Sequence, residues 1–313
     1  MEQLIKLTGE ISNAVWGWPM MILLLGTHIY LTIRLKIPQR KLFTAIKISL
    51  KKDKSAQGDV SQFAALATSL AATIGTGNII GVATAIGLGG PGAVLWCWLT
   101  GIFGIATKYG EGLLAIKYRV KSEDGRMLGG PMYALEKGLG LKWLAILFCI
   151  FTAIATFGIG NTVQANAISE NLSLVCEDII SPERTKMIAG FTLATIVGFA
   201  IIGGVKSIAK WCTALVPLMA LLYVLGCLYI LCVNHEYLGS AISLIFNEAF
   251  SLKAVGGGTA GTVLMAAARY GIARGLFSNE SGMGSAPIVA AAAQTKNPVR
   301  QALVSSTGTF WDT

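Results

Sequence analysis

The sequence has few charged residues and few of the groups that build catalytic or metal centres. Only 13% of its 313 residues are Asp, Glu, Lys or Arg, whereas 54% are hydrophobic. Two histidines, His28 and His235, stand far apart, and the six cysteines contain no Cys-x-x-Cys pair. A zinc site, a disulfide framework and a histidine-based catalytic centre are therefore not expected, and the sequence predicts a protein that is not an enzyme.

The long apolar runs indicate a polytopic all-α membrane protein. Mean hydropathy is +0.64, which is too high for a soluble globular chain. The first run, Ala14–Ile33, has no small-residue cleavage site after it, so we interpret it as a retained helix and not a signal peptide. The expected apolar runs are 14–33, 62–88, 92–116, 142–167, 187–203, 211–233, 257–293 and 301 to the last residue.

The positive charge follows the topology that these runs predict. Segment 34–54 carries eight basic residues and should be cytoplasmic, which places the N-terminus outside. With alternating crossings, the loops expected inside are basic, as in 117–137, and those expected outside are not, as in 168–186. The net charge of +9 is thus explained by orientation in a cell membrane, and nucleic acid is not an expected partner.

The stretch Ala71–Gly81 weakens the middle of a run long enough to cross a bilayer. It reads Ala-Ala-Thr-Ile-Gly-Thr-Gly-Asn-Ile-Ile-Gly, with three glycines inside an apolar segment. Each glycine costs a helix interior about 1 kcal/mol relative to alanine, and lipid offers no water to an opened backbone. Such a helix either packs closely on a neighbour, with Gly75, Gly77 and Gly81 as a small-residue stripe, or opens around a ligand.

Run 257–293 is too long for one straight crossing and contains a second expected break. Gly275–Gly284 should be unwound, and Ser285 with Pro287 suits a new helix start, with Ser285 as the cap. The two breaks lie on helices of opposite direction, which indicates an inverted-repeat transporter. Five apolar runs lie from the first break up to the second, as a five-helix repeat requires.

Two such breaks suit a small zwitterion and a sodium ion. Unwound helices expose N–H groups to a carboxylate and carbonyls to a hard cation, and Thr73 adds a hydroxyl. No acidic residue lies near the first break in the sequence, which favours a neutral amino acid over an organic cation.

Four segments resemble the sodium:alanine symporter family, also described as alanine or glycine:cation symporters. Gly89–Gly104 resembles the family signature, with Leu95 and Cys97 where Phe and Met are usual. Thr73–Ile79, Arg274–Pro287 and the ending Phe-Trp-Asp-Thr also match. The resemblance covers the whole chain, at the spacing of the first two thirds of such a protein, so the chain looks like a fragment.

The resemblance implies a LeuT-like inverted-repeat fold in a single transmembrane domain, 1–313, with an extra N-terminal helix at 14–33. The first repeat would be 62–233, and the second would begin at 257 and be incomplete by 313. The implied task is sodium-coupled uptake of alanine or glycine across the plasma membrane, with Na+ as coupling ion and no other cofactor. Proton coupling, a passive channel and a non-transporting fragment are the alternatives.

The same resemblance implies a set of binding residues. The substrate would meet Thr76, Gly77, Asn78, Gln164, Phe277, Ser278 and Asn279. Backbone carbonyls of Ala71 and Ile74 would form half of a sodium site, whose other half would follow residue 313.

Several of these residues have a second interpretation. Gln164 could join two helices, and Phe277 could be packing only. Arg269, Arg274 and Glu280 could form structural or gating ion pairs. Trp96 and Trp98 could be an interfacial belt. Segment 238–252 could be a surface helix or a re-entrant one.

Overall fold

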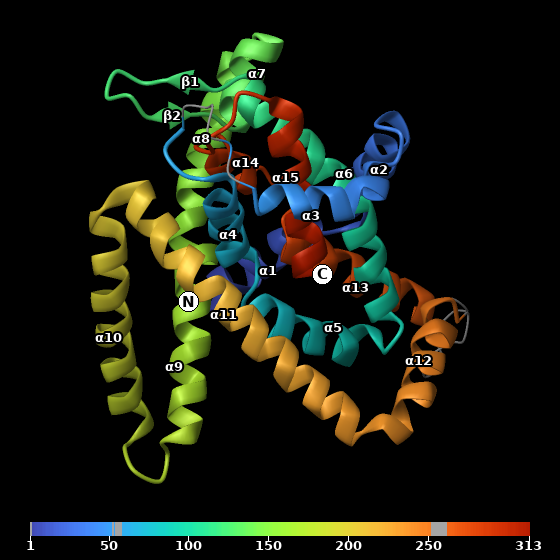
Figure 1. The fold of residues 1–313 in the computed structure, drawn as a ribbon. Coiled ribbons are helices and arrows are strands. Elements are labelled where there is room, and N and C mark those ends of the chain that lie inside the picture. Colours follow the sequence, from blue (N-terminus) through green and yellow to red (C-terminus); the bar gives the residue numbers. More distant parts are fainter. Residues whose placement is uncertain (1, 52, 54–57, 252–261) are drawn as a thin grey trace.

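The computed structural model describes residues 2–51, 53, 58–251 and 262–313, most of which lie in helices. Strands occur there only in a short antiparallel hairpin, β1 (Val120–Lys121) with β2 (Met127–Leu128), in the basic loop expected inside (Figure 1). The helical architecture expected from the apolar runs is confirmed.

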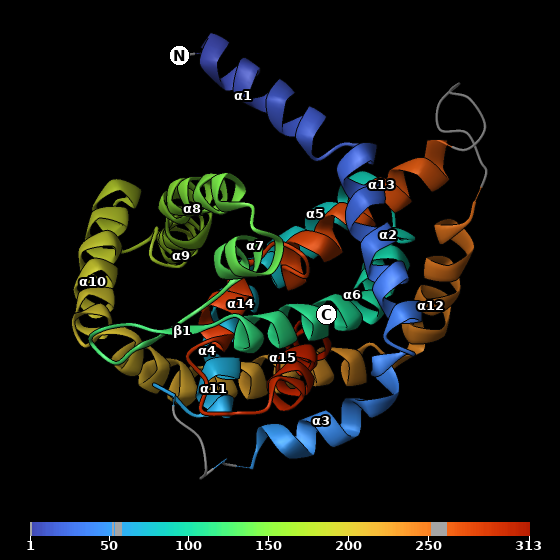
Figure 2. The ribbon, with the colours of Figure 1, turned by 90° about the horizontal axis from the view of Figure 1, so that it is seen from above.

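The N-terminal part contains two separate helices before the basic segment. The elements are α1 (Glu2–Val15), α2 (Trp18–Arg34), the 3-10 turn η1 (Pro38–Lys41) and α3 (Leu42–Ser49). The run expected from Ala14 is interrupted: its first two residues end α1, and α2 starts only at Trp18, because Gly17 is extended and Pro19 suits a first helical turn. Figure 2 shows α1 projecting away from the other helices.

The first interrupted run and the helix after it form the centre of the fold. The elements are α4 (Gln62–Thr73), η2 (Gly77–Gly81), α5 (Val82–Gly89) and α6 (Ala93–Lys117). Element η2 is a single turn of π-helix, which we call a wide turn. The Ser61 hydroxyl accepts a hydrogen bond from the Ala64 N–H at 3.1 Å and caps α4. Helix α6 packs against α2, α13, α14 and α15, so it connects the two ends of the chain.

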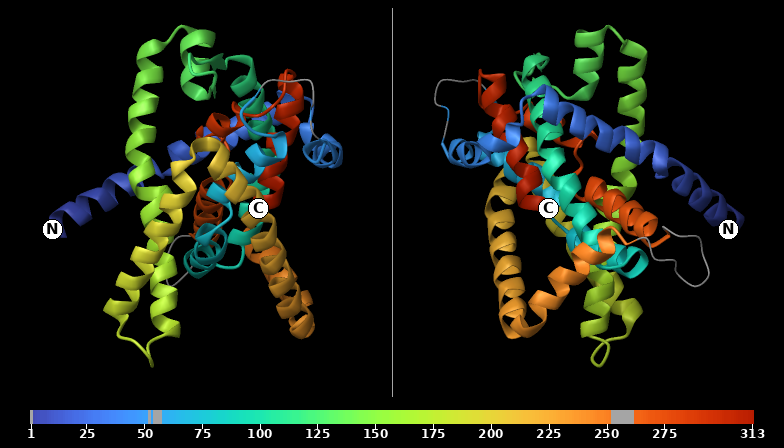
Figure 3. Two further views of the ribbon diagram at one scale, coloured as in Figure 1. Left: turned by 60° about the vertical axis from the view of Figure 1, so that its left-hand side comes forward. Right: turned by 90° about the vertical axis from the view of Figure 1, so that its right-hand side faces the viewer.

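The middle of the chain forms long helices that extend from this centre (Figure 3). They are α7 (Pro131–Leu139), α8 (Lys142–Phe157), the wide turn η3 (Gly158–Thr162), α9 (Val163–Val175), α10 (Pro182–Ile202), α11 (Gly204–Val233) and α12 (His235–Ala249). The run expected to end at residue 167 therefore continues to Val175. Segment 238–252 is helical as far as Ala249, and residue 252 lies outside the described residues.

Helix α12 rests on the turn between α5 and α6. A side chain at Gly92 would collide with the backbone of Ala249, so glycine allows this close approach. The indole N–H of Trp96 donates to the Ala249 carbonyl at 3.0 Å, and its ring packs on Phe250. Trp96 thus has a packing role, whereas Trp98 is exposed, as an interfacial belt would be.

Several helices have the length and composition of membrane spans. Among the described residues, three qualify singly: Lys142–Val175, Pro182–Ile202 and Gly204–Val233. Two bent pairs, Trp18–Arg34 with Pro38–Ser49 and Gln62–Thr73 with Gly77–Gly89, raise the number to five if each pair is one span. These helices expose large apolar side chains such as Ile202, at 82%, which suits contact with lipid and not with water.

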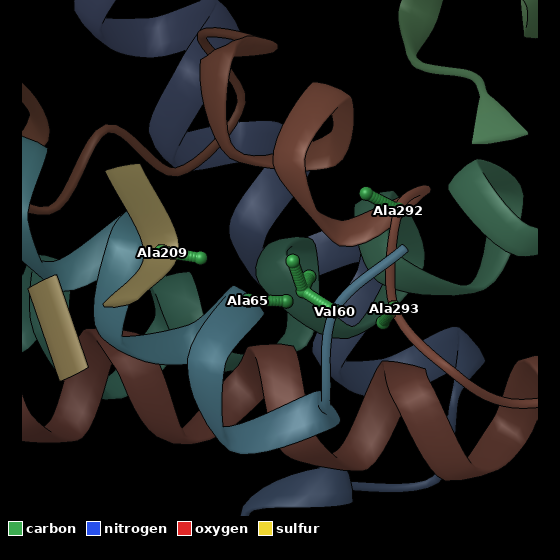
Figure 4. Close-up of a cluster of buried hydrophobic side chains, with 5 residues drawn as sticks. All are labelled: Val60, Ala65, Ala209, Ala292 and Ala293. Carbon is green, nitrogen blue, oxygen red and sulfur yellow. The ribbon is translucent and has the colours of Figure 1, made fainter. Parts of the chain in front are cut away.

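The last part of the chain returns to the centre as α13 (Thr262–Asn279), α14 (Ser285–Ala290) and α15 (Pro298–Asp312). The start expected at 257 lies outside the described residues. Val60, just before α4, packs with Ala65, Ala209, Ala292 and Ala293 in a small buried cluster (Figure 4). Because Val60 also pairs with Ala293 through the backbone, the start of α4 is joined to the chain just after α14.

Candidate functional site

The first break lies where the glycines predict it. Helix α4 ends at Thr73, Ile74 is extended, and the axis bends by 51° before α5 continues. The Asn78 side chain closes the break locally, since its Oδ1 accepts from the Gly75 N–H at 2.9 Å. The expected interruption of this helix is confirmed.

The glycines of this break make room for side chains from other helices. A Cβ at Gly77 or Gly81 would overlap the Arg274 guanidinium, and one at Gly75 would come within 3.1 Å of the Gln164 amide. The glycines therefore do pack closely, but they pack against two polar side chains and not against another small-residue helix. Close packing and an opened polar site are both present.

The second break is shorter than expected. Helix α13 continues to Asn279, so the prediction that unwinding begins at Gly275 is wrong. Gly275 lies in regular helix against Thr100, whose side chain a Cβ there would overlap. The chain unwinds only at Glu280–Gly284, where Glu280, Gly282 and Gly284 have positive φ.

Helix α14 starts at Ser285, as expected, but Ser285 does not cap it. The N-cap is Gly284 in the left-handed conformation, with no side-chain cap. The Ser285 hydroxyl instead donates to the Glu280 carboxylate. Gly284 can adopt this conformation without the strain that a Cβ would bring.

Asn78 connects the two breaks. Its Nδ2 lies 3.1 Å from Ser278 Oγ on α13, and 2.8 Å and 3.0 Å from the carbonyl and Oδ1 of Asp312 on α15. One side chain from the first break therefore contacts both of the helices that carry the C-terminal part of the site. The predicted residues Asn78 and Ser278 are brought together.

Asp312 is a site residue that the sequence reasoning missed. It is buried, its Oδ2 has no hydrogen-bond partner among the described residues, and it lies beside Asn78. The inference that no acidic residue lies near the first break is thus wrong, because the carboxylate arrives from 234 residues along the chain. The sequence did contain a signal for Asp312, because a carboxylate inside an apolar run is costly in a membrane and usually has a functional role.

Gln164 joins the first break from the middle of the chain. Its Oε1 accepts from the Thr76 hydroxyl at 2.9 Å and from the Thr76 N–H at 3.4 Å. Gln164 lies at the start of α9, directly after the wide turn η3. Such turns expose backbone groups and occur often at functional sites. Gln164 does join two helices, and it does so at the expected site.

A cavity of about 1010 Å³ lies between the two breaks and the α8–α9 helix. Its lining includes three charged side chains, namely the carboxylates of Glu170 and Glu280 and the guanidinium of Arg274. The predicted residues that line it are Ala71, Thr76, Gly77, Gln164, Arg274, Phe277, Ser278 and Glu280. The cavity thus offers hydroxyl, amide, charged and aromatic groups together, which suits a small polar solute.

Two of the predicted substrate residues, Asn78 and Asn279, do not line this cavity. Asn279 is 1% exposed; its Oδ1 accepts from the Ser281 N–H, and its Nδ2 lacks a partner in the described structure. The Phe277 ring meets Trp16 edge-on at 6.1 Å and lies 5.2 Å below the Arg274 guanidinium. Phe277 therefore packs as well as facing the cavity.

The expected ion-pair group does not assemble. Within the described ranges, Arg269, Arg274 and Glu280 form no ion pair with one another within 4 Å. Arg269 lies over the Tyr270 ring. Two guanidinium nitrogens of Arg274, Nε and Nη2, are buried without an acceptor there.

The groups that the first break could offer to a cation are oxygen atoms. In the described part of the chain, no group of three or more His, Cys, Asp or Glu residues could hold a metal ion. Ala71 lines the cavity and Ile74 lies in the extended part of the first break. Their carbonyls remain the predicted half of a sodium site.

Comparison with known proteins identifies the family. The sequence matches the sodium:alanine symporter family over residues 1–313. It is 50% identical to the sodium/alanine symporter AgcS of Methanococcus maripaludis, over 99% of this chain and 68% of that protein. It is 52% identical to an uncharacterised transporter of Haemophilus influenzae, over 98% of this chain and 67% of the relative.

A more distant relative is the probable sodium/glutamine symporter GlnT of Bacillus subtilis, 37% identical over the whole chain and 64% of its own length. The chain spans about two thirds of the length of these curated relatives. The family and the relatives consist of transporters and not of enzymes. On this evidence the chain belongs to the sodium:alanine symporter family.

Proposed function

We propose that this chain carries out sodium-coupled symport of a small neutral amino acid, alanine or glycine, into the cell by alternating access. The observation that supports it best is the Asn78 amide, which connects the first break, Ser278 beside the second break and Asp312. A ligand bound there contacts parts of both expected repeats. Alternating access requires such a shared site, because the repeats move against each other around it.

The amino acid would lie between the two breaks. Its carboxylate would meet the N–H groups of Thr76 and Gly77, since unwound helix ends carry partial positive charge. Gln164 and Ser278 would orient the polar end through hydrogen bonds, Phe277 would pack on the apolar side chain, and Asn78 and Asn279 would hold the two breaks. The substrate carboxylate is then met by N–H groups of the first break.

A sodium ion would bind close to this substrate. The Ala71 and Ile74 carbonyls are neutral oxygen ligands of the kind that transporter breaks offer to Na+. The Asp312 carboxylate adds negative charge beside the first break. This mechanism uses no other cofactor. Its partners are the amino acid, the sodium ion and the lipid bilayer.

The fold proposal is a LeuT-like inverted repeat in the plasma membrane. Helix α2 would be the extra N-terminal helix, 62–233 the first repeat, and the second repeat would begin at 257. The N-terminus would lie outside. The 51° bend between α4 and α5 and the unwinding at Glu280–Gly284 support it, because they interrupt two apolar segments as such repeats require.

Transport by purified protein in liposomes tests the proposal. We expect uptake of labelled alanine under an inward sodium gradient and loss of that uptake when choline replaces sodium. Asn78→Ala should reduce uptake at least tenfold, since it removes the bridge to Ser278 and Asp312. Asn247→Ala is the matched control, because Asn247 is exposed on α12 and bonds only Ser243 among the described residues.

Three outcomes separate the alternatives. Uptake that continues in choline with a proton gradient, and stops without one, would replace sodium by protons as the coupling ion. Uptake without saturation or counterflow would indicate a channel. Glycine and glutamine, added as competitors, measure the substrate size, and stronger competition by glutamine than by glycine would contradict the small-substrate assignment.

A further inference from the structure

The second break leaves backbone groups without helical partners at both of its ends. The carbonyls at the end of α13 and the N–H groups before α14 belong to this unwound link, in which Gly284 is buried and Gly282 is exposed. Helix α13 presents partial negative charge at its C-terminal end, and the N–H groups that precede α14 have no intrahelical acceptors. Buried groups of this kind need partners from elsewhere in the protein.

Two side chains of α6, one helical turn apart, form hydrogen bonds with these backbone groups. Lys108 is 2% exposed, and its ammonium group donates to the Glu280 carbonyl at 3.3 Å. Glu111 Oε1 accepts from the N–H of Gly282 at 3.1 Å and from the N–H of Gly284 at 3.2 Å. A cation thus meets the carbonyl end and a carboxylate meets the N–H end of the break.

The second oxygen of Glu111 has a different environment. Oε2 is buried and has no hydrogen-bond partner in the described structure. Glu111 also lines a cavity of about 500 Å³, distinct from the larger one, whose other walls include the apolar residues Leu114, Ala134, Phe148 and Pro287. The carboxylate therefore carries one satisfied oxygen and one oxygen that is free to take a proton.

Four other titratable groups lie at the second break or at the small cavity beside it. Glu280 belongs to the break itself, and Lys108 lies on α6 with Glu111. From α2, His28 is fully buried, its Nδ1 pairs with the Thr107 hydroxyl, and its Cε1 would lie 3.8 Å from a Cβ at Gly282. The phenol of Tyr118 lines the same small cavity as Glu111.

We propose that Glu111 is a proton-binding site that controls the geometry of the second break. As an anion it accepts two charge-assisted hydrogen bonds from Gly282 and Gly284 and holds the unwound link in place. A proton on Oε2 neutralises the carboxylate and weakens both bonds, since neutral hydrogen bonds are roughly half as strong. The ligand is a single proton, and Glu111 acts on the substrate site as a positioning residue.

Hydrogen–deuterium exchange of the purified protein, without any amino acid, tests this proposal independently of transport. After correction for intrinsic exchange, the peptide that covers 278–286 should exchange about tenfold faster at pH 5.5 than at pH 8 in the wild type. Glu111→Gln keeps an acceptor oxygen but not the charge. In that variant the peptide should exchange at the faster rate at both pH values.

Glu183→Gln is the control, because Glu183 is exposed in the first turn of α10, and it should behave as the wild type. A pH response that persists unchanged in Glu111→Gln overturns the proposal, as does slow exchange of that variant at both pH values. The link to the proposed function is measured separately, as alanine affinity over the same pH range. Failure of the wild type to bind alanine would contradict the substrate assignment and leave the exchange result standing.

Discussion

The close approach of Arg274 to the first break predicts the outcome of adding one methyl group. Gly81→Ala places a Cβ inside the Arg274 guanidinium, whose Nε and Nη2 are already buried. Overpacking of this kind costs about 1–3 kcal/mol. Alanine also gains about 1 kcal/mol of helix propensity over glycine. The net effect on stability should therefore lie between about zero and 2 kcal/mol of destabilisation.

Gly87→Ala provides a matched control on α5. A Cβ at Gly87 meets nothing within 4 Å, so this substitution gains the same propensity without the steric cost. The difference in unfolding free energy between the two variants then isolates the overlap, about 1–3 kcal/mol. Thermal unfolding in detergent, followed by tryptophan fluorescence, should give a midpoint for Gly81→Ala several degrees below that of Gly87→Ala.

The double variant decides whether Arg274 is the cause. In an Arg274→Ala background the guanidinium is absent, so Gly81→Ala and Gly87→Ala should shift the midpoint equally. Residues in direct contact show such coupling, typically 0.5–3 kcal/mol. A difference that survives in the Arg274→Ala background would refute the reasoning, and so would equal midpoints for the two single variants.

Three further predictions concern contacts made by other side chains. Trp96→Phe removes the hydrogen bond to the Ala249 carbonyl and should lower stability by about 1 kcal/mol, whereas Trp98→Phe at an exposed site should have no measurable effect on the unfolding midpoint. Arg119→Lys replaces a guanidinium that donates to the carbonyls of Ala291, Ala293 and Thr295, and should lower the unfolding free energy by about 1.5–3 kcal/mol. Gln164→Met removes the acceptor for Thr76 and should weaken alanine binding about tenfold in equilibrium binding.

The helices and the first break could be predicted because their signals are local. Apolar length fixes where a helix can cross, and three glycines with Thr76 and Asn78 mark where it weakens. The wide turn at Gly158–Thr162 was not predicted, since two glycines in an apolar run do not by themselves distinguish a turn from packing. The end of α13 was predicted five residues too early, because Gly275 packs on Thr100 inside a regular helix.

The parts of the site that sequence reasoning missed depend on distant contacts. Asp312 reaches Asn78 because the backbone of Val60 pairs with the residues around Ala293, which brings α15 beside α4. Glu111 was not recognised because a single carboxylate within an apolar run gives no indication of its partner. Both residues were visible as charges at membrane depth, and only the fold identifies what they contact.

Helix α6 explains how two breaks far apart in sequence can act together. Small residues give it close contact on more than one side: a Cβ at Gly104 would come within 3.0 Å of Ser281, and one at Gly112 would overlap Ser305 on α15. The second break and α15 therefore lie directly on α6, within reach of Lys108 and Glu111. Since α15 also carries Asp312 to Asn78, a displacement of the second break along α6 would be felt at the first break through one continuous set of packed contacts. This arrangement gives protonation of Glu111 a physical route to the substrate site.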